Sequence, residues 1–426
     1  MNTIQDFARV AVIGQGYVGL PLAVAVADAG ATVVGIDASQ ARVDQLNSGV
    51  SPVSDVPDAL LVRVAGAGRY RASTLFADVR GCDVVVLCVP TPYSNQAPDL
   101  SHVESAARQV GAHLSPGTLV ILESTTYPGT TEEVLLPLLE AASGLTGGED
   151  FDVAFSPERI DPGNPEYGIH NTPKIVGGIG PRATSRAADF YRLFVSRVIP
   201  VSSPAAAEMT KLLENTFRHI NIALVNELAI LARDMGIDMW EVIDAADSKP
   251  FGFMPFYPGP GVGGHCIPVD PMYLSWRVRQ FGGAAKFIEL ARDINDAMPL
   301  YCATRIQDLL NDRGKALRGA RVLIAGVAYK RDIGDIRESP ALPLIVALMR
   351  KGAVVDFVDP HVDSLMLPDG QVLSAVDVDS ALGEGVDCVA IVTPHRDLPY
   401  DRLLGVDLVF DTRNALKSDA PNVHRL

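Results

Sequence analysis

The chain has 426 residues, of which 48% are hydrophobic and 20% are charged, a balance typical of a folded globular protein with two or three domains. Its formal net charge of −15 argues against a nucleic-acid partner, which would need a dense basic face. No apolar run approaches the roughly 18 residues of a membrane span. The start lacks the basic and apolar regions of a secretory signal, so we expect a cytoplasmic protein without a membrane partner.

The cysteines are five in number and widely separated, which argues against a disulfide framework and against a metal site. Cys82, Cys88 and Cys388 lie in apolar runs, where a thiol behaves as a small inert hydrophobe. Cys266 differs from these three because it lies in a loop. We therefore expect no metal, and we treat Cys266 as the one thiol with a possible chemical role.

The N-terminal part predicts a doubly wound α/β domain. Residues 9–14 (RVAVIG) are a short β-branched run ending in glycine, residues 20–30 have helical spacing, and residues 31–37 (ATVVGID) form a second strand. Two further buried strands are expected within residues 81–90 and 118–125. This order of strand, turn, helix and strand is the βαβ unit of a parallel sheet.

The middle of the chain is predicted to be helical. Apolar residues recur at helical spacing over residues 205–236 without an internal proline or glycine, which predicts a long helix of the kind found at oligomer interfaces. A glycine- and proline-rich loop (residues 257–271) follows, and residues 273–311 return to helix. After residue 316 strands and helices alternate again, which predicts a second α/β domain.

Gly14, Gly16 and Gly19 form a G-x-G-x-x-G motif between the first strand and the first helix. Such glycines permit a tight turn, a close approach of the backbone to a pyrophosphate, and close packing of the helix on its strand. Asp37 ends the next strand, where a carboxylate would accept a hydrogen bond from a ribose 2′-hydroxyl and repel a 2′-phosphate. The combination predicts an NAD site; Arg42 is the one nearby feature that would suit NADP.

The second α/β domain has only Gly326 in the corresponding turn, so it lacks a second dinucleotide motif. Lys330 and Arg331 follow its first strand, at the usual place for a ligand in an open sheet. A solvated basic turn is the alternative interpretation.

A polar row follows the long helix. Lys211, Glu214, Asn215 and Arg218 are spaced by three and four residues, so they share one face. This face either lines a cleft or is an exposed surface of paired charges. His219 alone is more often a satisfied histidine than a ligand.

The loop YPGPGVGGHCIPVDP contains Cys266 among four glycines and four prolines, which exclude a regular helix or a central strand. A loop thiol beside freed backbone amides could be a thiolate nucleophile, or it could merely fill a turn. The neighbouring His265 does not imply a direct cysteine–histidine pair, because adjacent side chains usually diverge.

With these motifs in this order, the chain resembles the nucleotide-sugar 6-dehydrogenases, the family of UDP-glucose, GDP-mannose and UDP-N-acetylhexosamine dehydrogenases. The resemblance extends over nearly the whole length. It is carried by GQGYVGLPLA from Gly14, VPTP from Val89, ESTTYPGTT from Glu123, FSPERIDPGN from Phe155, KLLENTFRHINIALVNE from Lys211, GPGVGGHCIPVDP from Gly259 and GVAYKRDIGDIRESPA from Gly326.

The resemblance implies three domains. These are an NAD-binding Rossmann domain (residues 1–202), a central helical and dimerisation domain with the catalytic loop (203–315), and a Rossmann-like domain that binds the UDP-sugar (316–426). It also implies a four-electron oxidation of the sugar C6 hydroxyl to a carboxylate with two molecules of NAD. We accordingly expect a UDP-sugar substrate and a homodimer or higher homo-oligomer.

Catalytic roles implied by the resemblance fall on six residues: Cys266, Lys211, Asn215, Asp270, Glu158 and Thr125. Cys266 would add to the C6 aldehyde and give a thiohemiacetal, which a second oxidation converts to a thioester. Lys211 and Asn215 match a pair that stabilises the oxyanion. Asp270, with a water and Thr125, would handle protons in the first oxidation, and Glu158 would assist hydrolysis of the thioester.

Ligand contacts also follow from the resemblance. Those expected for the cofactor are Gly14, Gly16, Tyr17, Val18, Gly19, Asp37, Pro90, Thr91, Thr125 and Arg337. Those expected for the substrate are Glu158, Arg159, Lys211, Asn215, Arg218, His219, Asn221, Gly263 and Lys330.

Departures from the UDP-glucose enzymes suggest a subgroup. Where those enzymes have a second acid and a lysine, this chain has Pro162 and Val269. GHCIPVDP and NTFRHINIALVNELA are similar to the UDP-N-acetylhexosamine enzymes, and HCIPVDP followed by MYLSW favours UDP-N-acetylglucosamine, whose uronic acid would serve a surface polysaccharide or glycan.

Other activities remain as alternatives. They are a UDP-N-acetylmannosamine or UDP-glucose 6-dehydrogenase, a two-electron dehydrogenase in which Cys266 is structural, and a non-catalytic nucleotide-sugar-binding protein.

Overall fold

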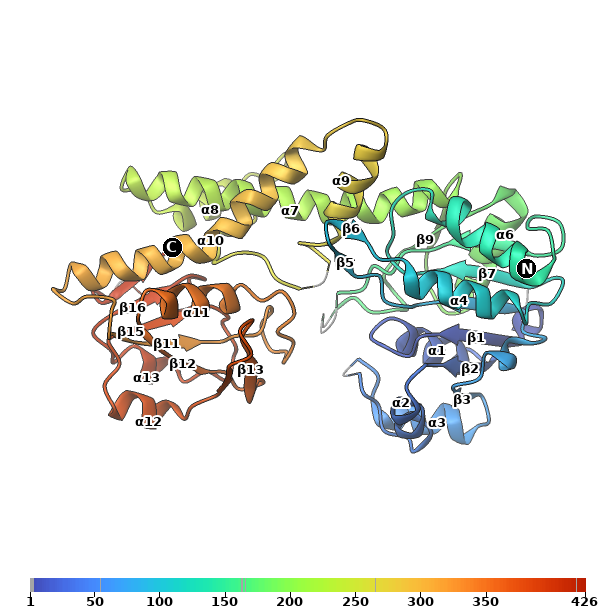
Figure 1. Ribbon diagram of the computed structural model, residues 1–426, viewed down its shortest axis with the longest axis horizontal. Coiled ribbons are helices and arrows are strands. Elements are labelled where there is room, and N and C mark those ends of the chain that lie inside the picture. The colour runs from blue at the N-terminus through green and yellow to red at the C-terminus, as the bar shows by residue number, and fades with distance from the viewer. Residues whose placement is uncertain (1–3, 54, 162–163, 165, 265, 419) are drawn as a thin grey trace. The chain divides into compact units, whose positions relative to one another are not determined.

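The computed structural model describes residues 4–53, 55–161, 164, 166–264, 266–418 and 420–426. The chain divides into two compact units, each of which is described by itself (Figure 1). The first unit comprises Met1–Glu214 and Trp276–Gly283, and the second comprises Asn215–Ser275 and Ala284–Leu426. None of the described helices combines the length and the apolarity that a membrane crossing requires.

The first unit is built on an eight-stranded sheet with the strand order β10-β9-β8-β7-β4-β1-β2-β3. Neighbouring strands from β3 to β8 in this order are parallel, whereas β9 runs antiparallel to β8 and parallel to β10. The strands are β1 (Arg9–Ile13), β2 (Thr32–Ile36), β3 (Tyr70–Ser73), β4 (Val84–Leu87), β7 (Leu119–Leu122), β8 (Asp152–Phe155), β9 (Lys174–Gly178) and β10 (Val198–Pro200).

Helices cover both faces of this sheet, which is why β4 and β7 are fully buried apolar runs. The helices on one face are α1 (Gly19–Asp28), α2 (Gln40–Asn47), α3 (Asp58–Gly66) and α6 (Gly180–Arg192). Those on the other are α4 (Ser101–Gly111) and α5 (Leu136–Ser143). Shorter elements are η1 (Ile4–Phe7), η2 (Phe76–Val79), η3 (Thr131–Leu135), β5 (Tyr93–Ser94) and β6 (Ala97–Pro98).

The long helix predicted over residues 205–236 is confirmed as α7 (Pro204–Asp234). Residues 273–311, predicted to return to helix, do so in two separate helices. This stretch contains the end of α9 (Asp270–Gln280) and all of α10 (Lys286–Asn311), because the chain turns at Gly282, whose φ of 74° suits glycine. Between α7 and α9 lies α8 (Met239–Asp247).

The second unit contains the predicted second α/β domain, a five-stranded parallel sheet with the order β12-β11-β15-β16-β17. Its strands are β11 (Arg321–Ala325), β12 (Val354–Val358), β15 (Cys388–Ile391), β16 (Val409–Asp411) and β17 (Val423–Arg425). One face packs on α10 and α11 (Ala341–Arg350), the other on α12 (Val378–Gly383) and α13 (Tyr400–Leu403). The same unit contains a separate antiparallel hairpin of β13 (Ser364–Met366) and β14 (Val372–Ser374). The expected class, α/β with two Rossmann-like sheets and a helical middle, is confirmed.

Candidate active site

The glycine turn after β1 has the geometry that its sequence predicts. Gly14 has a φ of 90°, and a Cβ atom there would lie 2.4 Å from the carbonyl oxygen of Cys88. A Cβ atom on Gly19 would lie 1.8 Å from the carbonyl oxygen of Gly14. Around Gly16 the nearest atom to such a Cβ is 3.7 Å away, on Arg42. Two of the glycines are therefore required by packing, and the third leaves space for a ligand to approach the backbone.

Asp37 and Gln15 hold this turn in place. The two carboxylate oxygens of Asp37 accept hydrogen bonds from the backbone N–H groups of Gln15 and Ser39, each at 2.9 Å. The buried Gln15 side chain donates to the carbonyl oxygen of Val12 at 2.9 Å and accepts from the Tyr70 hydroxyl at 2.9 Å. An open glycine backbone beside an ordered carboxylate at the end of β2 fits the adenosine end of NAD.

Further predicted cofactor residues lie in the turn and at the carboxyl ends of neighbouring strands. Val18 precedes α1, and Tyr17 is 53% exposed beside it. After β4, Pro90 is exposed and Thr91 is buried, and the Thr91 hydroxyl donates to the carbonyl oxygen of Thr125 at 2.8 Å. Because Thr125 follows the adjacent strand β7, this bond ties together two strand ends at the edge where ligands bind in open parallel sheets.

Glu158 is held by backbone and side-chain donors. One carboxylate oxygen accepts from the backbone N–H groups of Arg159 and Ile160, each at 2.7 Å, and the other lies 3.0 Å from Lys174 Nζ. Arg159 itself forms a bidentate pair with Glu214, with its shorter contact at 2.5 Å. The predicted substrate residues Glu158 and Arg159 are thus both ordered by charge pairs. Pro162, which takes the place of the second acid of the UDP-glucose enzymes, lies outside the described residues.

The polar row on α7 is only partly exposed. Lys211 is 9% exposed and Asn215 is 5% exposed, so neither belongs to an exposed face of paired charges, whereas Arg218 is exposed. His219 is 1% exposed, and burial lowers its pKa to about 4, so the ring is neutral at physiological pH. Asn221 donates to the carbonyl oxygen of Phe217 one turn earlier in the same helix.

Cys266, Asp270 and Asn215 come together in the second unit. The Asn215 amide donates to an Asp270 carboxylate oxygen at 2.5 Å, and the Asp270 N–H donates to the Cys266 carbonyl oxygen at 2.9 Å. Asp270 is the first residue of α9 and is 1% exposed, whereas Cys266 is exposed. The turn into α9 therefore fixes the thiol's backbone relative to a buried carboxylate and an amide. His265 lies outside the described residues.

The cysteine loop packs against the loop that carries the predicted residues Lys330 and Arg337. The Gly264 N–H donates to the Arg337 carbonyl oxygen at 3.0 Å. Cβ atoms on Gly263 and Gly264 would lie 2.7 and 2.8 Å from Tyr329 side-chain atoms. Glycine is required here by close contact. Lys330 is half-buried, and the exposed Arg337 pairs with Asp335 at 2.6 Å.

Sequence reasoning missed two asparagines that anchor this loop. The Asn226 side-chain oxygen accepts from the Gly259 N–H at 2.9 Å, and its amide donates to the Asn295 side chain at 2.9 Å. Both asparagines are at most 3% exposed, and they come from α7 and α10. Their only sequence signal is an amide on the buried face of each helix. Lys174 and Glu123, which contact each other in the first unit, were also missed.

In the second sheet the acid that corresponds to Asp37 is used by the protein itself. Asp359 follows β12, and one of its oxygens accepts from the N–H groups of Val327 and Ala328 at 2.7 and 3.2 Å. The same oxygen lies 3.0 Å from Nε2 of the buried His395. Burial would raise the pKa of Asp359, but these bonds hold it below its usual value. The lack of a second dinucleotide motif agrees with this arrangement.

An open glycine turn, an ordered acid at the end of β2 and polar side chains at the carboxyl edge of the sheet define a dinucleotide-binding protein of the Rossmann type. Comparison with protein families makes this specific: the chain belongs to the UDP-glucose/GDP-mannose dehydrogenase family. The family's NAD-binding domain matches residues 8–195, its central domain residues 205–297, and its UDP-binding domain residues 323–418. The protein is therefore an NAD-dependent nucleotide-sugar dehydrogenase.

Individual relatives cover most of the chain. It is 36% identical over 420 residues to a UDP-N-acetyl-D-mannosamine dehydrogenase of Pyrococcus horikoshii, covering 96% of both chains. It is 39% identical over 358 residues to a UDP-N-acetyl-D-glucosamine 6-dehydrogenase of Pseudomonas aeruginosa, covering 84% of this chain and 83% of the relative. A solved UDP-D-ManNAc dehydrogenase from P. horikoshii superposes with a TM-score of 0.89 at 34% identity, covering 98% of both chains.

We predict that Gly19→Ala weakens NAD binding by about 100-fold, or ~2.7 kcal/mol, because the new Cβ would force the Gly14 peptide to move. Calorimetric titration with NAD measures this. Gly66→Ala is the matched control, since no atom lies within 4 Å of its Cβ position, and it should bind NAD as the wild type does. Wild-type affinity in Gly19→Ala would contradict the assignment of this turn to the cofactor.

Proposed function

We propose that the protein oxidises the C6 hydroxyl of a UDP-N-acetylhexosamine to the uronic acid in two NAD-dependent steps, through a covalent adduct on Cys266. The substrate that we propose is UDP-N-acetylglucosamine. The observation that carries this proposal is the ordered arrangement of Cys266, Asp270 and Asn215 at the start of α9. An exposed thiol whose loop is pinned beside a buried carboxylate and amide suits a nucleophile better than a structural cysteine.

Asp270 and Thr125 would act in the first oxidation. The C6 hydroxyl loses a hydride from carbon and a proton from oxygen, and Asp270 takes the proton through a water that Thr125 orients. NAD, when bound, supplies the hydride acceptor for both oxidations.

Cys266 then retains the aldehyde. Its thiolate adds to C6 and gives a thiohemiacetal, and loss of the second hydride converts this to a thioester. The addition creates a negative oxygen, which Lys211 and Asn215 would stabilise. One N–H of the Asn215 amide is used by Asp270, which fixes the orientation of the amide and leaves its other N–H to donate to the oxyanion.

Hydrolysis completes the reaction. Water attacks the thioester carbonyl, Glu158 accepts the proton, and the C–S bond breaks to give the uronate and the free Cys266 thiol. Over the cycle one alcohol, two NAD⁺ and one water become one carboxylate, two NADH and three protons. The bonded Glu158 carboxylate supports this role because its geometry is set by three donors.

Two observations support the N-acetylhexosamine class. The HCIPVDP loop is similar to that subgroup, and two of the relatives are named for N-acetylated sugars. The 39% identity to the P. aeruginosa protein favours the glucosamine epimer. The mannosamine epimer is the second candidate, because the P. horikoshii relative matches over a larger share of the chain.

A homodimer is part of the proposal, and α7 supports it. Seven apolar side chains, six on this helix and one directly after its last residue, are between 38% and 66% exposed and recur at intervals of three, four and seven residues. They are Met209, Leu213, Phe217, Leu224, Leu228, Leu231 and Met235. A long apolar stripe of this spacing is typical of a helix that packs on a partner helix, and we propose a second copy of the chain as that partner.

Wild-type protein is expected to produce two NADH per UDP-N-acetylglucosamine, and Cys266→Ser to lose at least about 10³-fold in steady-state rate because the nucleophile is gone. NADH absorbance and product mass measure both. Cys82→Ala is the control, since burial raises the pKa of Cys82 to about 11 and keeps this thiol neutral. A wild-type yield of one NADH per sugar would instead support the two-electron dehydrogenase.

Among UDP-glucose and the UDP-linked N-acetyl derivatives of glucosamine, galactosamine and mannosamine, UDP-N-acetylglucosamine should have the highest kcat/KM, by about 10-fold or more. Steady-state assays with NAD measure this. Preference for UDP-N-acetylmannosamine would overturn the epimer, and preference for UDP-glucose would overturn the subgroup. Absence of NADH formation with all four would support a non-catalytic binding protein.

Leu224→Lys with Leu228→Lys should convert the dimer to a monomer, because two ammonium groups would be buried in an apolar contact. Sedimentation velocity measures the mass. Leu75→Lys is the matched control, because Leu75 is 64% exposed and is not on α7. If the wild-type protein sediments as a monomer at micromolar concentration, the dimer proposal is contradicted.

A further inference from the structure

Lys174, the first residue of β9, bridges two carboxylates in the interior of the first unit. Its Nζ lies 3.1 Å from Glu123 Oε1 and 3.0 Å from Glu158 Oε2. The three side chains are 7%, 0% and 15% exposed, respectively. Solvent therefore screens these contacts much less than it screens a surface ion pair.

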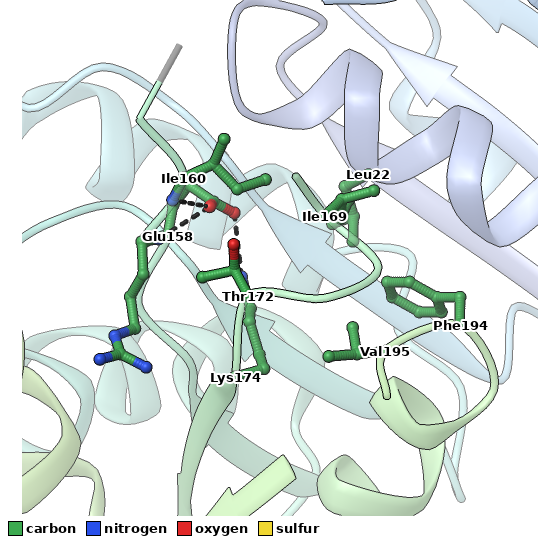
Figure 2. Close-up of a pocket in the computed structure, with 9 residues that line it drawn as sticks. Leu22, Glu158, Ile160, Ile169, Thr172, Lys174, Phe194 and Val195 are labelled. Atoms are coloured by element: carbon green, nitrogen blue, oxygen red, sulfur yellow. Dashed lines mark hydrogen bonds and ion pairs between the residues drawn. The ribbon is translucent and has the colours of Figure 1, made fainter. Parts of the chain in front are cut away.

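Ordered side chains surround the Lys174 ammonium group on two sides. The Tyr191 hydroxyl donates to Glu123 Oε1, and Lys174 Nζ lies 5.2 Å from the centre of the Tyr191 ring. On the other side, Figure 2 shows Glu158 with its bonds to the Ile160 N–H and to Lys174, at a small cavity of about 10 Å³. This volume is about the least that can hold one water and is far too small for a sugar. The cavity's apolar residues are Leu22, Ile160, Ile169, Phe194 and Val195.

The direction of β9 brings Lys174 to this place. Phe155, the last residue of β8, pairs with Gly177 of β9, and the two strands are antiparallel. Lys174 therefore lies beyond the carboxyl end of β8, where Glu158 follows, and at the same edge of the sheet as Glu123, which follows β7. A parallel β9 would have put its first residue at the opposite edge.

Charge balance favours the ionised form of Glu158. Burial alone would raise the pKa of Glu158, but Lys174, the Ile160 N–H and Lys211 outweigh burial and hold it below its ordinary value. For Glu123 burial prevails, and its pKa lies above the ordinary value. Lys174 remains protonated because both carboxylates raise its pKa against the effect of burial. The two acids thus share one ammonium, and Glu158 has the Ile160 N–H and Lys211 in addition.

We infer that Lys174 is a positioning residue for thioester hydrolysis. It holds the Glu158 carboxylate in its ionised form and in a fixed orientation. Glu123, which shares the same ammonium group, weakens this effect of Lys174 on Glu158. This inference rests on the proposed function, because it concerns the step in which Glu158 accepts the proton of the attacking water. In this role Lys174 acts only through Glu158. It acts by holding one Glu158 oxygen, so that Glu158 reaches the hydrolysis step without a proton of its own.

Among the described residues, titratable groups from four parts of the chain act on Glu158 or are acted on by it. They are Lys174 on β9, Lys211 on α7, Glu123 after β7 and Cys88 after β4. Burial raises the pKa of Cys88, so its thiol is neutral, and Lys211 is left in place by the experiment below. Lys174 and Glu123 are therefore the two groups whose removal changes the field at Glu158 in opposite directions.

The test compares Lys174→Met, Glu123→Gln and the double variant with wild type, using UDP-N-acetylglucosamine and NAD between pH 3.5 and pH 9, so that the range includes pH values below the ordinary pKa of a glutamate. Removing the cation raises the pKa of Glu158. The acidic limb of the pH–rate profile, which is the pH range where the steady-state rate falls on acidification, should therefore move up by about one pH unit or more in Lys174→Met. At a pH on the acidic side of this limb, the rate of Lys174→Met should be at least about 10-fold below that of wild type. Intact-mass spectra of the variant should then show the acyl adduct on Cys266. Glu123→Gln should move the limb in the opposite direction.

Controls separate this role from a general loss of stability. Lys315→Met removes an exposed lysine paired with Asp387 and should leave the limb and the spectrum unchanged. Lys174→Met leaves the buried Glu123 and the half-buried Glu158 without their shared cation. If this variant does not fold, the double variant replaces it, because its net charge of −1 at this cluster equals that of the wild type. The double variant should have a limb between those of wild type and Lys174→Met.

A folded Lys174→Met or double variant with the wild-type acidic limb and no acyl adduct would overturn the role of Lys174. That result leaves the proposed function intact as long as the wild type forms two NADH per sugar. If the wild type forms one NADH or none, the proposed function itself fails, and the two failures are therefore distinguished by the wild-type stoichiometry alone.

Discussion

One lysine ammonium between a buried and a half-buried carboxylate constrains the carboxyl edge of the larger sheet. Glu123, Glu158 and Lys174 follow or begin three adjacent strands, so their charge pairs fix the ends of β7, β8 and β9 relative to one another. Removing one partner of a buried ion pair typically costs about 3–5 kcal/mol, because the other charge remains without a partner. The charge pairs therefore stabilise the same edge of the sheet that carries Thr91 and Thr125.

The same topological position has opposite uses in the two sheets. Asp37 follows β2 and Asp359 follows β12, each the second strand of its sheet in chain order. Asp37 accepts two backbone N–H groups beside a glycine turn with open space at Gly16. Asp359 accepts three backbone N–H groups and pairs with His395, so its oxygens hold the protein's own loop. One strand-ending acid can orient a ligand, and the other is consumed in building a loop.

Local sequence rules predicted the features that depend on a few neighbouring residues. The glycine turn at Gly14 and Gly19, the acid at Asp37 and the helix α7 all follow from the chain's own spacing and backbone preferences. The prediction of helix over residues 273–311 named no break, although Gly282 and Gly283 mark the turn between α9 and α10. Family resemblance supplied the roles of Cys266, Lys211 and Glu158, which no local pattern gives.

The sequence by itself determined two α/β sheets, a dinucleotide turn and a thiol in a loop that cannot be regular, because these depend on residue type and spacing along the chain. Only the tertiary structure decided that Lys174 meets Glu123 and Glu158, that Asn226 and Asn295 anchor the cysteine loop, and that His219 is buried. These contacts join residues from 16 to 69 positions apart. They depend on the direction of β9 and on how α10 packs beside α7, neither of which is encoded in local periodicity.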